Sequence, residues 1–232
     1  MSPASATKTV LLIGASRGLG YAMAEEYLKR GWRVVGTVRG PRTKLHDLAG
    51  RSDQLEIETL DMTEPDQIAA LRGRLAGRIF DLLFVNAGVT NNPAETIGQV
   101  STDEFARVMI TNALAPMRVV ESLADLVSPS GTIGVMSSGQ GSVANNTMGQ
   151  REVYRGSKAA LNMFMRSFAA RRADDGRAMA LMAPGWVRTD LGGPEGRLSV
   201  EESIPNLVDV LLSIEGKPGL VYLDYLGRTV PW

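Results

Sequence analysis

The side chains of Tyr154 and Lys158 form a pair that could transfer a proton to a bound ligand. On a helix, residues four apart share a face, so both side chains can reach the same ligand. A tyrosine hydroxyl can protonate a carbonyl oxygen if its pKa falls from about 10 toward neutral, and an ammonium group held beside it stabilises the phenolate. The spacing therefore indicates acid–base chemistry at a carbonyl or alcohol, provided that other elements bring a reaction partner to this helix.

A glycine-rich run from Gly14 to Gly20 follows the apolar stretch Thr9–Ile13 and precedes a helical stretch from Tyr21 to Arg30. A strand that ends in such a turn before a helix presents backbone N–H groups and the helix N-terminus to a pyrophosphate. Glycine lets the chain turn tightly and leaves room for phosphates against the backbone. The spacing G-x-x-x-G-x-G differs from the general fingerprint G-x-G-x-x-G, so a plain strand–helix connection stays open at this point.

Strand-like apolar runs alternate with helical stretches along the whole chain, which is typical of a parallel sheet covered on both faces. The 232 residues fit one α/β domain, residues 1–232, with a sizeable core. We predict a doubly wound parallel sheet of seven strands with helices on both faces. Its strands are expected at Thr9–Ile13, Arg33–Val38, Leu55–Thr59, Phe80–Asn86, Gly131–Ser137, Arg177–Ala183 and Gly219–Leu223.

Local signals mark where several helices begin. Ser101 and Ser199 each precede a glutamate by three residues, which is typical of a capping box, and Pro65 suits a first helical turn. The helix after Ser101 is expected to run to about Val127, and another is expected over 152–172.

The least regular segment is 184–197, which is rich in glycine and proline between a predicted strand and a predicted helix. Ligands of doubly wound folds bind at the C-terminal edge of the strands, where this segment would lie. We therefore predict that 184–197 forms a substrate loop.

Composition excludes several classes of function. The formal net charge is zero, which leaves no electrostatic footprint for nucleic acid or an anionic membrane. The chain has no cysteine, and its one histidine, His46, has no second histidine or thiol nearby, so no metal site is expected. The segment Met1–Lys8 lacks the apolar core of a signal peptide, and no apolar run approaches the roughly 18 residues of a membrane span. We expect a cytoplasmic protein.

Four further motifs follow the glycine turn in order: Val85-Asn86-Ala87-Gly88, Ser137-Ser138, Tyr154-Arg155-Gly156-Ser157-Lys158 and Pro184-Gly185-Trp186-Val187-Arg188-Thr189. This order, from about Thr9 to Leu223, resembles the short-chain dehydrogenase/reductase family. The segment 184–193 and the ending near Pro231-Trp232 are most similar to its small carbonyl-reductase/C-factor-like branch. The resemblance implies a single-domain Rossmann fold and oxidoreductase activity with a nicotinamide cofactor.

The end of the second predicted strand bears on the choice between NAD and NADP. NAD-binding proteins usually place Asp or Glu there for the ribose 2′-hydroxyl, and that acid would repel a 2′-phosphate. Here Val38 takes the place of the acid and Arg39 follows it, while Arg17 lies in the glycine turn. Two guanidinium groups suit a phosphate dianion, so the sequence favours NADP (NADPH) over the alternative of two ordinary surface arginines.

The resemblance also implies which residues contact the cofactor. Asp61 would accept a hydrogen bond from the adenine amino group, although an ordinary role at the start of a helix near Thr63 is equally compatible. Val85 and Ile13 depart from the family's usual Asn and Thr, and Ile13 loses a hydroxyl contact. The full predicted set is Gly14, Ser16, Arg17, Gly18, Leu19, Gly20, Arg39, Asp61, Met62, Asn86, Ala87, Gly88, Tyr154, Lys158, Pro184, Gly185, Val187 and Thr189.

By the same resemblance, the catalytic set is Asn112, Ser138, Tyr154 and Lys158. Tyr154 would donate the proton, its pKa lowered by Lys158 and by the positive ring of the oxidised cofactor, and Lys158 would also bind the nicotinamide ribose. Asn112 lies inside a predicted helix, where asparagine is a poor residue. In the family it distorts the helix and holds a water that links the lysine to solvent; a solvent-facing asparagine is the alternative.

Ser138 would hydrogen-bond the substrate oxygen, because the family's serine is usually the second of the pair. The segment between Ser138 and Tyr154 is a few residues longer than the commonest family spacing. Ser137 and Ser142 therefore remain alternatives.

Together, these motifs predict an NADPH-dependent reductase of small or medium aldehydes, ketones or quinones, or the reverse alcohol dehydrogenase. One alternative is a cofactor-binding regulatory or signalling protein with little turnover. Another is an epimerase or dehydratase of nucleotide sugars, for which the short segment after Asp190 leaves little room. The family resemblance implies a homodimer or homotetramer, and no nucleic-acid or membrane partner is expected.

Overall fold

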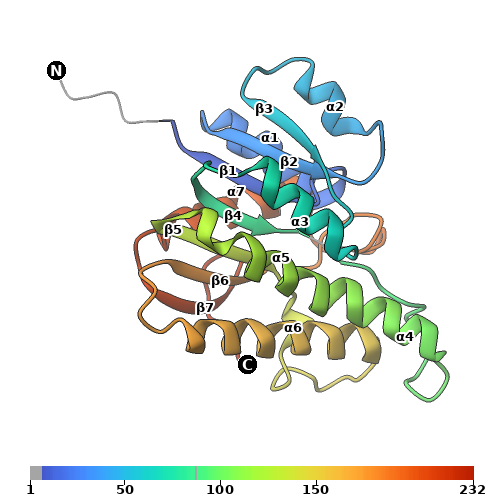
Figure 1. Ribbon diagram of the computed structural model, residues 1–232. Helices are drawn as coiled ribbons and strands as arrows, with labels where there is room; N and C mark the ends of the chain where they lie inside the picture. The colour runs from blue at the N-terminus through green and yellow to red at the C-terminus, as the bar shows by residue number, and fades with distance from the viewer. Residues whose placement is uncertain (1–6, 87) are drawn as a thin grey trace.

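The computed structural model describes residues 7–86 and 88–232. Seven strands form one sheet in the order β3-β2-β1-β4-β5-β6-β7, and every neighbouring pair is parallel (Figure 1). The predicted doubly wound α/β sheet is thereby confirmed. The strands are β1 (Thr9–Ile13), β2 (Arg33–Val38), β3 (Leu55–Thr59), β4 (Phe80–Val85), β5 (Val127–Met136), β6 (Ala178–Ala183) and β7 (Gly219–Asp224).

Strand β1 shows why the sheet must be covered on both faces. Successive strand residues point to opposite faces, so Leu11 and Ile13 enter one core while Val10 and Leu12 enter the other. All four are buried. A strand that is apolar on both faces is stable only between two layers that exclude water from it.

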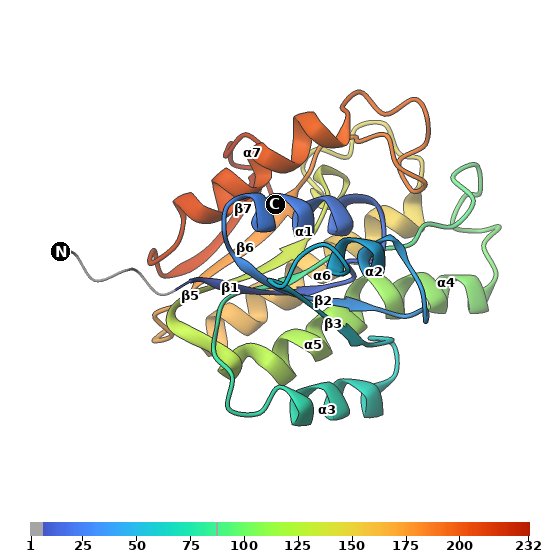
Figure 2. The same cartoon turned by 90° about the horizontal axis from the view of Figure 1, so that it is seen from above.

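Two groups of helices provide these layers, as the view from above shows (Figure 2). One face carries α1 (Gly18–Lys29), α2 (Lys44–Ala49) and α7 (Val200–Ser213), and the other carries α3 (Pro65–Arg74), α4 (Thr102–Met109), α5 (Ala115–Leu123) and α6 (Glu152–Arg171). Pro65 opens α3, as predicted. Within residues 7–86 and 88–232, no helix is both long and apolar enough to cross a membrane.

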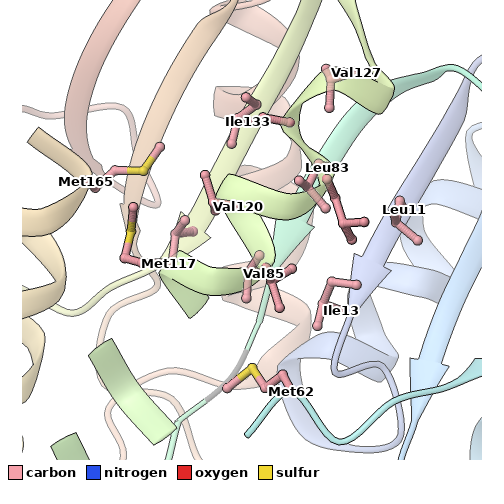
Figure 3. Close-up of a cluster of buried hydrophobic side chains, with 14 of the residues drawn as sticks. Leu11, Ile13, Met62, Leu83, Val85, Met117, Val120, Val127, Ile133 and Met165 are labelled. Atoms are coloured by element: carbon pink, nitrogen blue, oxygen red, sulfur yellow. The ribbon is translucent and has the colours of Figure 1, made fainter. Parts of the chain in front are cut away.

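One core lies between the sheet and helices α5 and α6 (Figure 3). Val120 of α5, Met165 of α6 and Ile133 of β5 belong to the same cluster of buried side chains. Methionine side chains are flexible enough to fill irregular gaps in such a core, and Met117 lies there too. This packing fixes α6, the helix that carries the predicted acid, against the centre of the sheet.

The structure changes the ends of several predicted elements. Strand β5 begins at Val127, where its first residue pairs with Phe80, rather than at Gly131. Pro129 and its polar neighbours hide this beginning from a search for apolar runs. Helix α1 begins at Gly18, inside the glycine turn, rather than at Tyr21.

Of the two predicted capping boxes, the one at Ser199 is complete. The Ser199 hydroxyl accepts from the Glu202 amide at 3.2 Å, and the Glu202 carboxylate accepts from the Ser199 amide at 2.6 Å. Ser101 likewise accepts from the Glu104 amide, but the Glu104 carboxylate binds Arg107 at 2.7 Å. The prediction of a complete capping box at Ser101 is therefore wrong. The Glu104 carboxylate binds Arg107, one turn later, instead of the Ser101 amide.

The long helix predicted after Ser101 is interrupted at its middle. Helix α4 ends at Met109, a π-helical turn η1 (Ile110–Leu114) follows, and α5 continues from Ala115. Two short 3₁₀ turns, η2 (Ala124–Leu126) and η3 (Gly139–Gly141), lie on either side of β5. Single π turns inside helices often occur at functional sites, and this one contains Asn112.

The hydroxyl of Tyr27 leads to a prediction about stability. Tyr27 is fully buried beside Trp32, and within the described residues its hydroxyl has no hydrogen-bond partner. A buried hydroxyl without a partner costs about 1–3 kcal/mol. We expect Tyr27→Phe to raise the free energy of unfolding by about 1 kcal/mol in urea denaturation. The matched control is Tyr21→Phe, which removes a hydroxyl that donates to Glu25 at 3.0 Å and should not stabilise the protein. A clear loss of stability in Tyr27→Phe would contradict the prediction.

Candidate active site

A cleft opens at the carboxyl ends of β1, β2 and β4, on the line between β1 and β4 where the strand order reverses. Ligands of doubly wound folds bind at this switch point. The cleft brings the glycine turn and the α6 pair together, although they are far apart in the sequence. The predicted residues that line it are Gly14, Ser16, Arg17, Gly18, Leu19, Arg39, Asp61, Met62, Asn86, Gly88, Tyr154, Lys158, Pro184 and Thr189.

Gly14 and Gly20 pack against each other and against the end of β4. Gly14 has φ +84°, and a Cβ there would lie 2.1 Å from the carbonyl oxygen of Asn86. A Cβ on Gly20 would lie 2.1 Å from the carbonyl oxygen of Gly14. The Asn86 side-chain amide donates to that same Gly14 oxygen at 3.1 Å. Only glycine fits at either position, because any side chain would overlap a backbone oxygen.

Thr37 of β2 also holds the turn, and the sequence reasoning missed it. Its hydroxyl accepts from the Gly14 amide at 2.9 Å, and its carbonyl accepts from the Ala15 amide at 2.9 Å. Ile13 lacks the hydroxyl that the family usually has before the first glycine, and here a neighbouring strand supplies one to the turn. The signal in the sequence is a single polar residue inside the apolar strand Arg33–Val38.

The turn suits the diphosphate of a dinucleotide. Helix α1 begins directly after Arg17, with neither a side-chain cap at that residue nor an acidic residue in its first turn. Gly18 and Leu19 line the cleft, so the positive end of the helix faces it without a competing carboxylate. The missing Cβ atoms of the turn let a ligand approach the backbone. The residues present therefore fit the cofactor that the sequence implies.

Arg17 and Arg39 line the cleft, and each lies beside a carboxylate. Arg17 pairs with Asp190 at 3.1 Å, and Arg39 lies 3.8 Å from Asp61. The Arg17 and Asp190 side chains are 72% and 82% exposed, so water screens their attraction and the pair is weak. A phosphate dianion can therefore compete for these guanidinium groups.

Asp61 lines the cleft and lies in the turn before α3, and the residue at the start of that helix is Glu64 rather than Asp61. Its carboxylate accepts from the Thr63 amide at 3.0 Å and from the Thr63 hydroxyl at 2.7 Å. Partial burial raises the pKa of Asp61, but the Thr63 hydrogen bonds and the charge of Arg39 outweigh it and hold the pKa below its usual value. Asp61 is therefore ionised at neutral pH.

Lys158 lies at the floor of the cleft. It is 2% exposed, and its ammonium donates to the carbonyl oxygen of Met136, the last residue of β5, at 2.9 Å. Gly88 lies beside it, since a Cβ on Gly88 would stand 3.5 Å from the lysine nitrogen. Burial lowers the pKa of Lys158 to about 8, so most of the molecules still carry the charge at neutral pH.

Tyr154 lies one helical turn before Lys158, whose nitrogen is 6.0 Å from the centre of its ring. Burial raises the pKa of Tyr154, and the neighbouring Ser138 side chain and the charge of Arg151 offset that rise only in part. The expected fall in this pKa is therefore not seen in the protein alone, because the phenolate would be poorly solvated. At neutral pH the hydroxyl keeps its proton, as a proton donor must.

The three candidate serines have different partners. The Ser138 hydroxyl accepts from the Gln140 amide at 3.2 Å and lies close enough to Tyr154 to offset part of the rise that burial causes in the pKa of that tyrosine. Ser137 lines the cleft, but its hydroxyl donates to Asn162 at 2.6 Å. The Ser142 hydroxyl accepts from a backbone amide three residues later, at 3.1 Å. This arrangement supports Ser138 as the serine that shares a ligand with the tyrosine.

Asn112 is fully buried, so it is not a solvent-facing asparagine. Its side chain both accepts from the Val89 amide and donates to the Val89 carbonyl, at 2.8 Å each. It also donates to the Ser157 hydroxyl at 2.9 Å, which in turn donates to the Tyr154 carbonyl at 2.8 Å. The π turn thus places one amide between the segment after β4 and helix α6.

The segment after β6 forms one side of the cleft. Pro184 and Thr189 line it, while Val187 is buried and forms a parallel bridge with Leu198. Gly185 has φ +84°, and a Cβ there would lie 2.5 Å from the Leu198 side chain. The segment predicted as irregular is therefore folded back on itself, with its two ends joined.

Some predicted residues are not among those that line the cleft. Gly20, Asn112 and Val187 are buried, Ser138 is half-buried and Gly185 is exposed. Ala87 lies outside the described residues. The sequence reasoning missed Thr37, Ser157 and Asn162. For Asn162 the signal was its position four residues after Lys158, on the same face of the helix.

The fold and the cleft define a doubly wound α/β protein with a dinucleotide-binding turn and a Tyr-Lys pair. A family model described as short chain dehydrogenase matches residues 8–197. The chain therefore belongs to the short-chain dehydrogenase/reductase family, and the resemblance seen in the sequence is confirmed.

Solved structures and a curated relative agree with this assignment. A protein of Burkholderia multivorans, crystallised with bound NADP and described as a short-chain dehydrogenase/reductase, is 67% identical, with a TM-score of 0.96 over 97% of this chain and 100% of that chain. A carbonyl reductase from Pseudomonas aeruginosa PAO1 in complex with NADP is 34% identical, with a TM-score of 0.90 over 98% of this chain and 100% of that one. The C-signal protein of Myxococcus xanthus is 35% identical over 154 residues, which are 66% of this chain and 92% of that protein, in line with the C-factor-like branch.

The geometry of Gly20 leads to a prediction about cofactor binding. Because a Cβ there would overlap the Gly14 carbonyl, Gly20→Ala must displace the turn and its amides. We expect the affinity for a nicotinamide dinucleotide, measured by fluorescence titration with NADPH and NADH, to fall about tenfold or more. The control is Gly73→Ala in α3, where a Cβ meets nothing within 4 Å and binding should not change. Unchanged affinity in Gly20→Ala would refute the assignment of this turn.

Proposed function

We propose that the protein is an NADPH-dependent reductase of small or medium, mainly apolar aldehydes, ketones or quinones. Family membership already makes it a short-chain dehydrogenase/reductase. The observation that carries the finer proposal is the buried Tyr154, which stands one turn from the buried Lys158 in a cleft that fits a dinucleotide. Ser138 lies beside this tyrosine and offsets part of the rise that burial causes in its pKa.

NADPH, when bound, supplies the hydride for the carbonyl carbon. The residues of the chain hold the carbonyl oxygen and supply its proton. Tyr154 keeps its proton because burial raises its pKa, so it can donate that proton as the oxygen becomes an alkoxide. The Ser138 hydroxyl donates a hydrogen bond to the same oxygen, and the charge of Lys158 stabilises the phenolate that remains.

Each turnover must return a proton to Tyr154. The Lys158 ammonium lies 6.0 Å from the centre of the Tyr154 ring, and its lowered pKa makes it a better acid than an exposed lysine. Asn112 holds the Val89 backbone and, through Ser157, the backbone of Tyr154. We infer that Asn112 keeps this corner of the site in place while a water between Lys158 and solvent completes the relay.

Three features support NADPH over NADH. Strand β2 ends in Val38 without an acid, and Arg39 and Arg17 line the cleft beside it. Their carboxylate partners are weak competitors for a phosphate. The Burkholderia and Pseudomonas proteins described above were both crystallised with NADP.

Exposed apolar side chains on the segments after Pro184 and after Ser138 support an apolar substrate. Leu191 lines the cleft and is 37% exposed, and Trp186 on the same segment is 43% exposed. Val143 and Met148, on the segment between Ser138 and Tyr154, are also exposed. Apolar walls with a few polar groups are typical of small-molecule sites. We therefore propose that 184–197 forms the substrate loop. We also propose that residues 1–232 form one domain.

We also propose that the protein forms a homodimer or homotetramer. Exposed apolar side chains lie on α4 with its π turn, at Phe105, Ile110 and Leu114, and on the neighbouring α6, at Met163 and Phe164. A second copy could cover such a surface. Sedimentation velocity that shows only a monomer at micromolar concentration would refute this.

The proposed function predicts that Tyr154→Phe loses reduction but keeps cofactor binding. General acid catalysis contributes about 10²–10⁴-fold, so kcat should fall by that factor while the Kd for NADPH stays within about twofold. The loss of NADPH absorbance against a panel of aldehydes, ketones and quinones measures turnover, with NADH as the cofactor control. A variant that keeps more than about a tenth of the wild-type kcat would show that Tyr154 is not the acid. A wild type without turnover on the whole panel would count against the reductase itself.

The pKa values of the site predict how reduction depends on pH. Reduction needs the proton on Tyr154 and the charge on Lys158, and both are present at low pH and lost at high pH. Because the pKa of Lys158 lies at about 8 and that of Tyr154 is raised, the lysine loses its proton first. The kcat/KM for NADPH in reduction, which reports the free enzyme, should therefore fall as pH rises through about 8. A rate that stays flat to about pH 10 would contradict this assignment.

A further inference from the structure

Tyr222 of β7 reaches across the sheet to the segment that carries Ser138. It is 2% exposed, and its hydroxyl donates to the backbone carbonyl of Ser138. Strand β7 is the edge of the sheet and is separated from β5 by β6, so this hydrogen bond joins the site to a strand that forms no part of the cleft lining. Burial raises the pKa of Tyr222, which keeps the hydroxyl a donor.

Asn162 holds the same segment from helix α6. With Tyr154 and Lys158 it forms a row at four-residue spacing on one helix face. Its side-chain oxygen accepts from the Ser137 hydroxyl at 2.6 Å, and its nitrogen donates to the Gly141 carbonyl at 3.2 Å. Both ends of the turn after β5 are therefore bonded to the helix that carries the predicted acid.

Trp232 packs against Tyr222. The C-terminal end of the chain lies near α6 and β7 (Figure 1). The two ring centres are 5.4 Å apart, and the guanidinium of Arg166 on α6 lies 4.9 Å from the centre of the indole. The Trp232 carbonyl accepts from the Ala144 amide at 3.0 Å. The segment after β7 thus fixes the Tyr222 ring and the beginning of the loop that leads to Tyr154.

Ser138 is held through its backbone and its side chain at once. Its carbonyl accepts from Tyr222, while its hydroxyl accepts from the Gln140 amide at 3.2 Å and acts on the pKa of the neighbouring Tyr154. The Ser138 carbonyl also accepts from the Gly141 amide at 2.8 Å. Without Tyr222 the peptide is therefore held by its own turn and no longer by β7, and a tilt of the peptide would move the serine hydroxyl relative to the tyrosine. A displacement of about 1 Å in a reacting group can reduce a rate by about 10²-fold.

We propose that Tyr222 is a positioning residue for the reduction: its hydroxyl holds the Ser138 peptide in the orientation that keeps the serine hydroxyl against Tyr154. The kinetic part of this inference rests on the proposed function. The structural part, that Tyr222 restrains the segment 138–145, does not.

The test is Tyr222→Phe, which removes the hydroxyl and keeps the ring that packs on Trp232. We expect kcat for carbonyl reduction to fall about tenfold while the Kd for NADPH stays within about twofold. Amide hydrogen exchange, followed by mass spectrometry, should become roughly fivefold or more faster over 138–145 and stay unchanged over the glycine turn 14–20. The matched control is Tyr27→Phe, which also removes a buried tyrosine hydroxyl, but one without a partner among the described residues.

Faster exchange over 138–145 together with a lower kcat and an unchanged Kd supports the proposal. Exchange that stays unchanged overturns it, and so does faster exchange with an unchanged kcat. Loss of NADPH affinity together with faster exchange across the whole chain would show a general structural role and would also overturn it. If the wild-type enzyme reduces no carbonyl, the proposed function fails separately, and exchange alone then decides whether Tyr222 restrains the segment.

Discussion

The contact between the glycine turn and the end of β4 is the constraint on which the cleft depends. Gly14, at positive φ, lies so close to the Asn86 carbonyl that no side chain fits between them, and Gly20 is equally close to Gly14. The contact joins β1 to β4 at the place where the strand order reverses. The chain segments that follow β1 and β4 leave this line toward opposite faces of the sheet. They separate there and leave a cleft, with the N-terminus of α1 at one side of it.

The other side of the cleft depends on burying a positive charge. Lys158 lies on α6, the helix that packs on the apolar core. Its ammonium donates to the carbonyl of the last residue of β5. Burial makes this lysine more acidic than an exposed lysine and makes Tyr154 less acidic than an exposed tyrosine. The free protein therefore holds a protonated tyrosine beside a charged lysine at neutral pH, which is the state that reduction of a carbonyl requires.

Polar side chains from distant elements keep these groups in place. Asn112 in the π turn and Ser157 hold the backbone at Tyr154, while Asn162 and Tyr222 hold the turn with Ser137 and Ser138. Each buried polar group in this set has a partner, as buried polar groups generally must. The rigidity of the site thus comes from η1, α6 and β7 as much as from the residues that face the cleft.

The sequence by itself determined the strand order along the chain, the alternation of strands and helices, the glycine turn and the Tyr154–Lys158 spacing. These follow from local rules: apolar periodicity, glycine at tight turns and four-residue spacing on a helix. Only the tertiary structure decided which serine lies beside Tyr154 and that burial raises the pKa of this tyrosine. It also decided that Glu104 binds Arg107 instead of completing a capping box. It also revealed Thr37 and Tyr222, whose partners lie 23 and 84 residues away. The physical reason is that burial and long-range hydrogen bonds depend on which elements the folded chain brings together, and no local pattern encodes that choice.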